Sequence, residues 1–329
     1  MSTERPCGVC NYSNSWNVLF FGTDDFSIET LKKLHSGKSQ LVNSLEVVTS
    51  DKRLKAVKKY ALDHNLPLHN WPIDVPKGKY DVGVVASFGH LIPETTISAF
   101  PWGMINVHAS LLPRWRGAAP VIHAVLNGDS NLNGELRYKL MNASNILMQE
   151  SCDVPQDITA QDLTKQLANL GARLLMKCLE NLPENLQKSI PQNSLQMETT
   201  KAPKVTLKMA VVNWNQESLH IYRQYRALTG YFELETSFRN NLIKLDKMMS
   251  PSFIQTLQIE DLFKKTANSQ IVLPGSVYIH RKRNILCIRC QDYWAGFQCV
   301  LVKNYKWMNP LEFYNGFLSK IPFTEWRFQ

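Results

Sequence analysis

Three common features are missing from this 329-residue sequence. No apolar run approaches the roughly 18 to 20 residues that are needed to cross a bilayer, so we expect no membrane contact. The turn after the first apolar run holds a single glycine, Gly22, instead of a G-x-G-x-x-G motif, so NAD binding is not inferred. The first ten residues contain one arginine, one glutamate and no apolar core. They resemble neither a secretory signal nor a persuasive Arg-rich transit peptide.

Cysteine is sparse and scattered, with seven residues in the whole chain. An odd, dispersed set is typical of a reducing compartment rather than of a disulfide scaffold. Cys287 and Cys290 have C-x-x-C spacing, but in a strand an offset of three places them on opposite faces. Cys7 and Cys10 have the same spacing, without a second pair nearby. We therefore predict no metal site.

Negative charge is scarce in the second half of the chain. Residues 1–200 carry 19 Lys and Arg and 19 Asp and Glu, whereas residues 201–329 carry 18 and 9. A chain of this length with 44% hydrophobic residues can form two domains. A basic second domain indicates a polyanion partner such as nucleic acid. Surface charge that only maintains solubility is the alternative.

The first half alternates short apolar runs with helical periodicity, which favours parallel strands connected by helices. We expect strands at 17–21, 45–48, 81–86 and 104–108, a short helix at 93–100 and a helix at 118–126. This pattern predicts an α/β fold with a Rossmann-like, doubly wound sheet. Ligands then bind beyond the carboxyl ends of the strands.

The second half begins after a long amphipathic helix, which we expect at 160–182. Residues 183–204 are polar and hold three prolines, which indicates a linker. A helix at 216–227 and strands at 242–247, 275–279, 284–288 and 299–303 indicate a small OB-like β-barrel. The expected domains are a tail at 1–15, a catalytic domain at 16–182, a linker at 183–207 and a C-terminal domain at 208–329.

Asn106 and His108 lie two residues apart at the end of a predicted strand, so their side chains leave the same face. Such a pair suits acyl chemistry, because the amide can donate to a developing oxyanion while the imidazole moves a proton. A strand-end histidine in a polar hydrogen-bond network is the alternative.

The string around this pair, residues 106–120, reads NVHASLLPRWRGAAP. It resembles the signature of the 10-formyltetrahydrofolate-dependent formyltransferases, and its PRWRGAAP half is similar to the methionyl-tRNA branch. The short loop at 49–55 resembles that of the mitochondrial type. Shorter matches stand at 20–23, 85–89, 202–204 and 223–227. The resemblance therefore spans roughly residues 16 to 329.

The resemblance implies that the amine of initiator methionyl-tRNA attacks the formyl carbon of 10-formyltetrahydrofolate, without a metal or a covalent intermediate. It implies Asn106 and His108 as catalytic residues. It also implies a mitochondrial (matrix) location. The folate-binding residues that it implies are Ser110, Leu111, Leu112 and Pro113, together with the backbone of Phe88, Gly89, His90 and Leu91.

The family's third catalytic residue, an Asp, aligns with Asn142, and the segment 134–144 that contains it is charged and shorter than the family's apolar strand. An Asn cannot supply the charge that supports an imidazolium, and a comparable swap costs on the order of 10⁴ in turnover. Three explanations are open: a working enzyme with altered geometry, a folate or tRNA binder without catalysis, or an atypical or mistranslated segment of an ordinary enzyme. Retention of every other motif favours the third.

Basic residues in two places are expected tRNA contacts, because phosphate binding rewards clustered positive charge. Lys52, Arg53 and Lys55 lie in a loop shorter than that of bacterial relatives, and solvated surface lysines are the alternative there. In the second half the expected contacts are Arg281, Lys282 and Arg283, with Lys303 and Lys306 as further candidates, and protection of exposed strand edges is the alternative.

Two rival functions stay open. One is a folate-dependent formyltransferase that acts on a small amine, such as a glycinamide ribotide or an amino sugar. The basic C-terminal half and residues 202–204 argue against it. The other is a binder without catalysis, which Asn142 alone supports. A monomer is the default expectation.

Overall fold

The computed structural model describes residues 15–38, 40–50, 55–109, 115–129, 145–191, 200–266 and 272–329, and the backbone of 135–142. The chain forms two compact units. The N-terminal unit comprises Met1–Ala118, Glu135–Asp153 and Thr164–Lys201, and the C-terminal unit comprises Ala119–Gly134, Val154–Leu163 and Ala202–Gln329. The units interleave along the sequence, whereas we expected contiguous domains, and the domain boundaries given above stay predictions.

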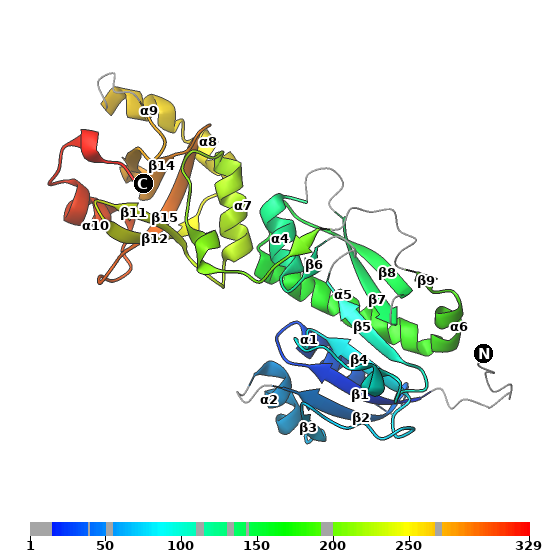
Figure 1. Cartoon of the computed structure of the whole chain (residues 1–329). Helices are drawn as coiled ribbons and strands as arrows, with labels where there is room; N and C mark the ends of the chain where they lie inside the picture. Colours follow the sequence, from blue (N-terminus) through cyan, green and yellow to red (C-terminus); the bar gives the residue numbers. More distant parts are fainter. Residues whose placement is uncertain are drawn as a thin grey trace. The chain divides into compact units, whose positions relative to one another are not determined.

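An eight-stranded sheet forms the centre of the N-terminal unit, in the order β3-β2-β1-β4-β5-β7-β8-β9 (Figure 1). The strands from β3 to β5 pair in parallel, and β7, β8 and β9 continue the sheet antiparallel. The parallel part confirms the predicted Rossmann-like fold. Its strands are β1 (Trp16–Gly22), β2 (Val42–Thr49), β3 (Leu68–Asn70), β4 (Val82–Ala86), β5 (Met104–His108), β7 (Glu135–Asn142), β8 (Asn145–Asp153) and β9 (Ile190–Pro191).

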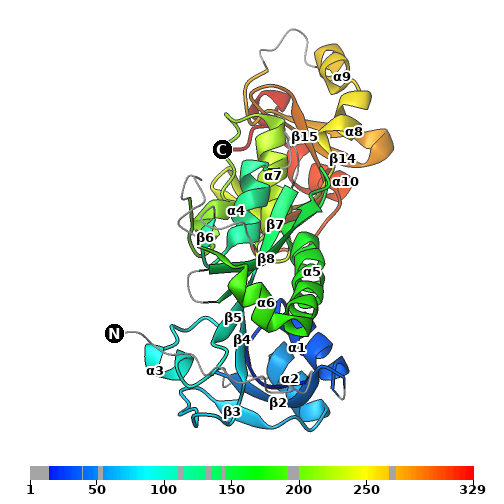
Figure 2. The ribbon, with the colours of Figure 1, turned by 90° about the vertical axis from the view of Figure 1, so that its right-hand side faces the viewer.

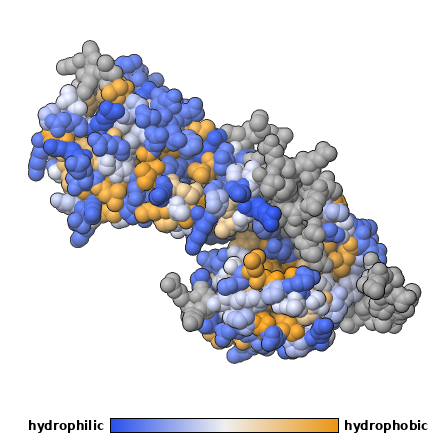
Figure 3. All heavy atoms as spheres, in the orientation of Figure 1, coloured by the Kyte–Doolittle hydropathy of each residue, from blue (hydrophilic) through white to orange (hydrophobic). Residues whose placement is uncertain are grey.

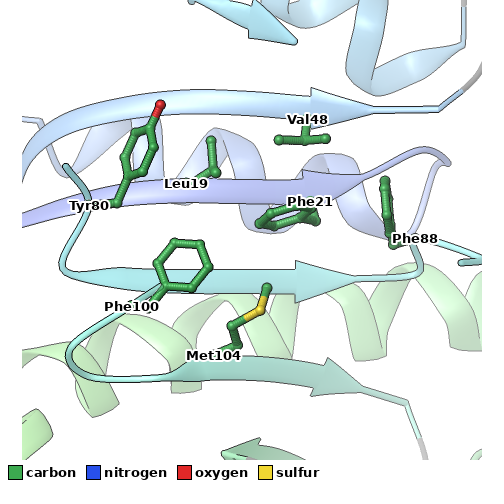
Figure 4. Packing of buried hydrophobic residues seen from close by; sticks show 7 residues of the cluster. All are labelled: Leu19, Phe21, Val48, Tyr80, Phe88, Phe100 and Met104. Atoms are coloured by element: carbon green, nitrogen blue, oxygen red, sulfur yellow. The ribbon is translucent and has the colours of Figure 1, made fainter. Parts of the chain in front are cut away.

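Helices and irregular segments cover both faces of the parallel strands. Figure 2 shows α1 and α5 on one side of β4 and β5, with α3 on the other. On the α3 side, Phe21 of β1 packs in a buried cluster with Phe88 and Phe100 (Figure 4). Burial on both faces explains why β1 and β4 read as continuous apolar runs. The helices of this unit are α1 (Ser27–Ser36), α2 (Ala56–Asp63), α3 (Glu94–Ile97), α5 (Ala160–Glu180) and α6 (Leu182–Gln187), and α5 begins in a segment of the other unit.

Glu46 on β2 joins three segments of this unit through its carboxylate. It accepts hydrogen bonds from Tyr80 Oη at 2.5 Å and from His69 Nε2 at 2.6 Å, and Lys79 Nζ lies 3.0 Å away. Burial opposes ionisation, but the hydrogen bonds from Tyr80, His69 and Lys79 outweigh it and hold the pKa of Glu46 below its usual range. The cluster therefore ties β2 and β3 to the segment that precedes β4.

We expect Glu46→Gln to destabilise the chain by about 1–2 kcal/mol at neutral pH, because the charge-assisted bonds are lost. Since the pKa is lowered by folding, the contribution is complete above the unfolded pKa and disappears as the pH falls through the folded pKa. Urea titrations from pH 7 to pH 3 should show the difference between wild type and variant shrinking toward acid. Glu29→Gln, which removes a surface pair with Lys32, is the control. A difference that stays constant over this range contradicts the assignment.

A five-stranded antiparallel sheet, in the order β11-β12-β15-β14-β13, forms the centre of the C-terminal unit. Its strands are β11 (Leu234–Phe238), β12 (Asn241–Met248), β13 (Val277–His280), β14 (Ile285–Arg289) and β15 (Trp294–Val302). The helices are α4 (Pro120–Asn127), α7 (Ser218–Leu228), α8 (Pro251–Thr256), α9 (Ile259–Thr266) and α10 (Pro310–Phe313), with short turns at η2 (Leu207–Ala210), η3 (Arg281–Arg283), η4 (Tyr314–Leu318) and η5 (Phe323–Glu325).

The segment 326–329 links the two edges of this sheet. On the β13 side, Val277 N donates to Trp326 O and Phe328 N donates to Gly275 O, each at 2.9 Å. On the β11 side, Gln329 N donates to Ser237 O at 2.9 Å. Strands β11 and β13 do not pair directly, so the sheet is not a closed barrel, and this segment bridges its two edge strands in a way that is consistent with the predicted OB-like barrel.

The thiols of Cys287 and Cys290 are both buried in the C-terminal unit. Burial raises the pKa of the Cys287 thiol and raises that of Cys290 to about 12. Cys7 and Cys10 lie outside the described residues.

Within the described ranges, no helix combines the length and the apolarity needed to cross a membrane. Figure 3 shows hydrophilic residues over most of the visible face of the C-terminal unit, with hydrophobic ones in scattered groups.

Candidate active site

Three neighbouring parallel strands of the N-terminal unit end at the same edge of its sheet. Gly22 of β1 pairs with Ala86 of β4, and Ala86 pairs with Val107 of β5. The residues that follow these strands, including Ser87, therefore meet at the carboxyl edge. This edge is where ligands bind in open α/β sheets.

Asn106 and His108 occupy the end of β5 at this edge, as expected from the sequence. Both are half-buried, and they alternate with the buried Ile105 and Val107. Because strand residues alternate between faces, Asn106 and His108 share the face opposite to Ile105 and Val107. An amide donor and an imidazole that share one face at a strand end can act together on one reacting carbonyl group.

Position 142 is the last residue of β7, which runs antiparallel to β5. The register pairs Asn142 with Ile105, whereas Met141 pairs with Asn106 and Lys139 with His108. Directly opposed positions in an antiparallel pair share a face of the sheet. Position 142 is therefore next to Asn106 along the ladder but on the sheet face of Ile105, opposite to the face of Asn106 and His108. The role of Asn142 stays a prediction.

A hydrogen-bond network that the sequence did not predict joins the ends of β1 and β4. Thr23 Oγ1 donates to Ser87 O at 2.9 Å, and Ser87 Oγ donates to Asp24 Oδ2. The other carboxylate oxygen, Asp24 Oδ1, accepts from the backbone N–H groups of Phe26 and Ser27, each at 3.1 Å. The carboxylate thus fixes the start of α1 and the loop after β4 at the same time. No local spacing could have indicated this link, because Ser87 lies 63 residues from Asp24.

The loop of residues 87–91 presents its backbone rather than a wall of side chains. Ser87 and Gly89 have positive φ angles of 43° and 79°, and a Cβ on Gly89 would meet no atom within 4 Å. Phe88 is only 3% exposed and belongs to the core, with its ring 5.3 Å from that of His90. Leu91 is 97% exposed. Open backbone and an exposed apolar side chain at the carboxyl edge suit a flat ligand with polar edges.

Several predicted site residues fall outside the described ranges. These are Ser110, Leu111, Leu112 and Pro113 of the expected folate stretch, and Lys52 and Arg53 of the basic loop. Lys55 is exposed and precedes α2. Beyond the undescribed stretch, the backbone N–H of Trp115 donates to Thr200 Oγ1 and that of Arg116 donates to Thr200 O, both at 2.8 Å.

The basic residues Arg281, Lys282 and Arg283 form the exposed turn η3 between β13 and β14 of the C-terminal unit. Lys303 and Lys306 are exposed as well, in the segment after β15. Their exposure is compatible with phosphate contacts and does not test them. Across the residues that the structure describes, no three His, Cys, Asp or Glu side chains gather closely enough to hold a metal ion.

Two family descriptions match this chain. Formyl transferase matches residues 74–179, and Formyl transferase, C-terminal domain, matches residues 204–318. The methionyl-tRNA formyltransferase, mitochondrial, of Homo sapiens is 42% identical over 317 residues, which cover 92% of this chain and 78% of that protein. The methionyl-tRNA formyltransferase of Caldanaerobacter subterraneus subsp. tengcongensis is 31% identical over 250 residues, which cover 70% and 79%.

Solved structures share the fold at low sequence identity. WlaRD, a sugar 3N-formyl transferase determined in the presence of dTDP and 5-N-formyl-THF, superposes with a TM-score of 0.60 at 16% identity. The match covers 88% of this chain and 98% of that one. At this identity the likeness supports the fold alone.

Proposed function

The chain belongs to the methionyl-tRNA formyltransferase family, and from this we propose that it transfers the formyl group of 10-formyltetrahydrofolate to the amino group of initiator methionyl-tRNA in organellar translation initiation. The observation that carries the proposal is that Asn106 and His108 lie on the same face of the sheet at the carboxyl end of β5. A location in the mitochondrial matrix, a monomeric state and the contiguous domains at 16–182 and 208–329 are parts of the same proposal.

The two side chains divide the work of the transfer. The co-substrate supplies the formyl group when it is bound. Asn106 Nδ2 donates to the formyl oxygen as negative charge develops there, which lowers the barrier to attack by the amine. His108 accepts the proton that the amine loses as its new bond to carbon forms, and returns a proton to the nitrogen that departs. No covalent bond to the protein is needed.

The loop of residues 87–91 supports folate binding in this proposal. Its open backbone at Gly89 and the exposed Leu91 leave room for a flat ring beside the ends of β4 and β5. Phe88 contributes through its backbone, since its side chain is buried. We assign the formyl-donor site to Phe88, Gly89, His90 and Leu91, with Ser110, Leu111, Leu112 and Pro113.

Ser87→Ala tests whether the link to Asp24 positions this loop. The change removes one hydroxyl and keeps the Cβ, so the backbone at φ 43° meets no new strain. We expect the KM for 10-formyltetrahydrofolate to rise about tenfold, equivalent to about 1.4 kcal/mol, with a smaller fall in kcat. Ser98→Ala removes a hydroxyl that bonds within α3 and serves as the control. Equal KM values for Ser87→Ala and wild type would show that the loop does not need the link.

The proposal for tRNA binding rests on Lys52, Arg53 and Lys55 and on Arg281, Lys282 and Arg283. Changing the last three to Gln together should weaken tRNA binding and make the slope of log K against log salt shallower by about 1 for each phosphate that the protein no longer neutralises. Removing the same charge from Lys32, Lys59 and Lys188 is the control, because Lys32 and Lys188 already pair with carboxylates. A slope that stays at the wild-type value rejects the C-terminal contact. The same test applies to Lys52, Arg53 and Lys55 changed to Glu.

A formylation assay with charged initiator tRNA, run beside a folate titration, separates this function from its rivals. Transfer to methionyl-tRNA supports the proposal. Transfer to a small amine alone identifies the other formyltransferase class, and folate binding without transfer identifies a binder. Sequencing the transcript over residues 130–150 tests whether the segment around Asn142 is the natural one. Recovery of an apolar strand and an Asp would mean that the natural enzyme has the family's usual sequence in this segment.

A further inference from the structure

A cavity of about 500 Å³ opens on the C-terminal unit, and none of its lining residues belongs to those assigned to formyl transfer. Its aromatic lining consists of Tyr278 of β13, Tyr314 of η4, and Phe323 and Trp326 at η5. All four side chains are half-buried. The volume is within the range of pockets that hold small molecules.

The aromatic walls are held in fixed orientations. The rings of Tyr314 and Trp326 meet edge to face with centroids 5.5 Å apart, and those of Phe323 and Trp326 lie 4.8 Å apart. Trp326 Nε1 donates to Leu318 O at 3.1 Å, which fixes the indole. Rigid aromatic surfaces of this kind lose little entropy when a flat ligand stacks on them.

The charges at the cavity are all positive. The Arg281 guanidinium lies over the Tyr314 ring, 4.6 Å from its centroid, and Lys282 beside it is exposed. Of the described residues that line the cavity, none is acidic. Aromatic faces next to an arginine and a lysine match the two parts of a nucleotide, since bases stack on rings and phosphate binds cations.

We propose that this cavity binds one unstacked nucleotide of the tRNA substrate, with its base against Tyr314 and Trp326 and its phosphate at Arg281 and Lys282. The inference rests on the proposed function for the identity of the partner. Bases in a helical stem are hidden in the stack, so the nucleotide comes from a loop or an end, where bases can be splayed out. An acidic peptide with an aromatic side chain has similar chemistry and is an outcome that the test separates.

Competition on the wild-type chain is the first test, and it needs no variant. AMP should displace labelled initiator tRNA at concentrations at which inorganic phosphate does not. If phosphate displaces tRNA as well as AMP does, only the cations take part and the proposal is overturned. Failure of AMP to compete also overturns it, and competition by an aspartate-tyrosine peptide in place of AMP assigns the cavity to a protein partner.

Tyr314→Ala should weaken tRNA binding about tenfold with the salt slope unchanged, because stacking is lost and no charge is removed. Tyr314→Phe keeps the ring and should bind as wild type, and Tyr231→Ala removes an exposed tyrosine outside the cavity as a control. Wild-type affinity in Tyr314→Ala, or equal losses in the Ala and Phe variants, overturns the proposal. Formylation measured on the wild-type chain separates the two inferences. Formyl transfer without competition by AMP rejects only the nucleotide site in the cavity. Competition by AMP without formyl transfer rejects only the proposed function.

Discussion

His108→Ala is expected to lower the turnover of formyl transfer on the order of 10³-fold, within the range that a positioned general base contributes. The imidazole at the end of β5 accepts the proton of the attacking amine, and alanine cannot replace it. Folate binding should change little, because the proposed donor contacts lie in the loop after β4 and in residues 110–113. Single-turnover formylation at saturating methionyl-tRNA, beside a folate titration, measures both quantities.

The matched control for this variant is His220→Ala, which removes an exposed histidine from α7 and should leave turnover unchanged. Asn106→Ala should lower turnover about 10²–10³-fold, because one hydrogen-bond donor to the developing oxyanion is lost. If Asn106 and His108 act on the same transition state, the double variant will lose less than the product of the two single losses. Turnover within threefold of wild type in His108→Ala would contradict the mechanism and favour the alternative, in which this histidine is part of a polar hydrogen-bond network at the strand end.

Sequence patterns predicted the parts of the fold in which burial sets the residue type. β5 coincides with the predicted strand at 104–108, because its buried positions Met104, Ile105 and Val107 are apolar. β15 begins at Trp294, five residues before the predicted start. Gly296 interrupts its pattern, and a Cβ there would come within 2.3 Å of Ile254 on α8. The glycine permits that close approach, a packing reason that the local pattern does not carry.

The antiparallel extension of the sheet and helix α6 were not predicted. β7 contains charged residues, so it lacks the alternating apolar pattern from which strands are predicted. α6 begins at Leu182, in a stretch that the prolines led us to interpret as a linker, although proline is well tolerated in the first turn of a helix. β7 is held by its pairing with β5 and β8, which the local sequence pattern does not show.

The candidate site also has a part that the sequence could predict and a part that it could not. Asn106 and His108 could be predicted because two residues on one strand share a face whatever the rest of the fold does. The Asp24 to Ser87 link could not, because it depends on β1 and β4 being neighbours in the sheet. For the C-terminal cavity, its aromatic residues are spread from Tyr278 to Trp326, and only the folded barrel brings them together.

Asn142→Asp is expected to leave turnover nearly unchanged if the register of β7 on β5 holds, and the size of any gain decides between the explanations for this segment. If position 142 sits where a carboxylate supports the imidazolium of His108, restoring the charge should recover up to about 10⁴-fold. The backbone register opposes this, since position 142 pairs with Ile105, on the sheet face opposite to Asn106 and His108. A gain therefore requires the end of β7 to present the new carboxylate toward the catalytic pair.

Asn145→Asp is the matched control. Asn145 on β8 pairs with Asn142 on β7, so this variant introduces the same charge one strand further from β5. The amide of Asn145 donates to Ser189 Oγ at 2.9 Å, and the serine hydroxyl, which donates to Leu186 O at 2.7 Å, would have to turn to donate to a carboxylate, so the stability of this variant is measured as well. Recovery with Asn142→Asp and none with Asn145→Asp would identify a working site that lacks one charge. No gain from either variant, with folate binding intact, would place the defect in the rewritten segment 134–144 as a whole, because a single carboxylate then fails to compensate for an altered strand.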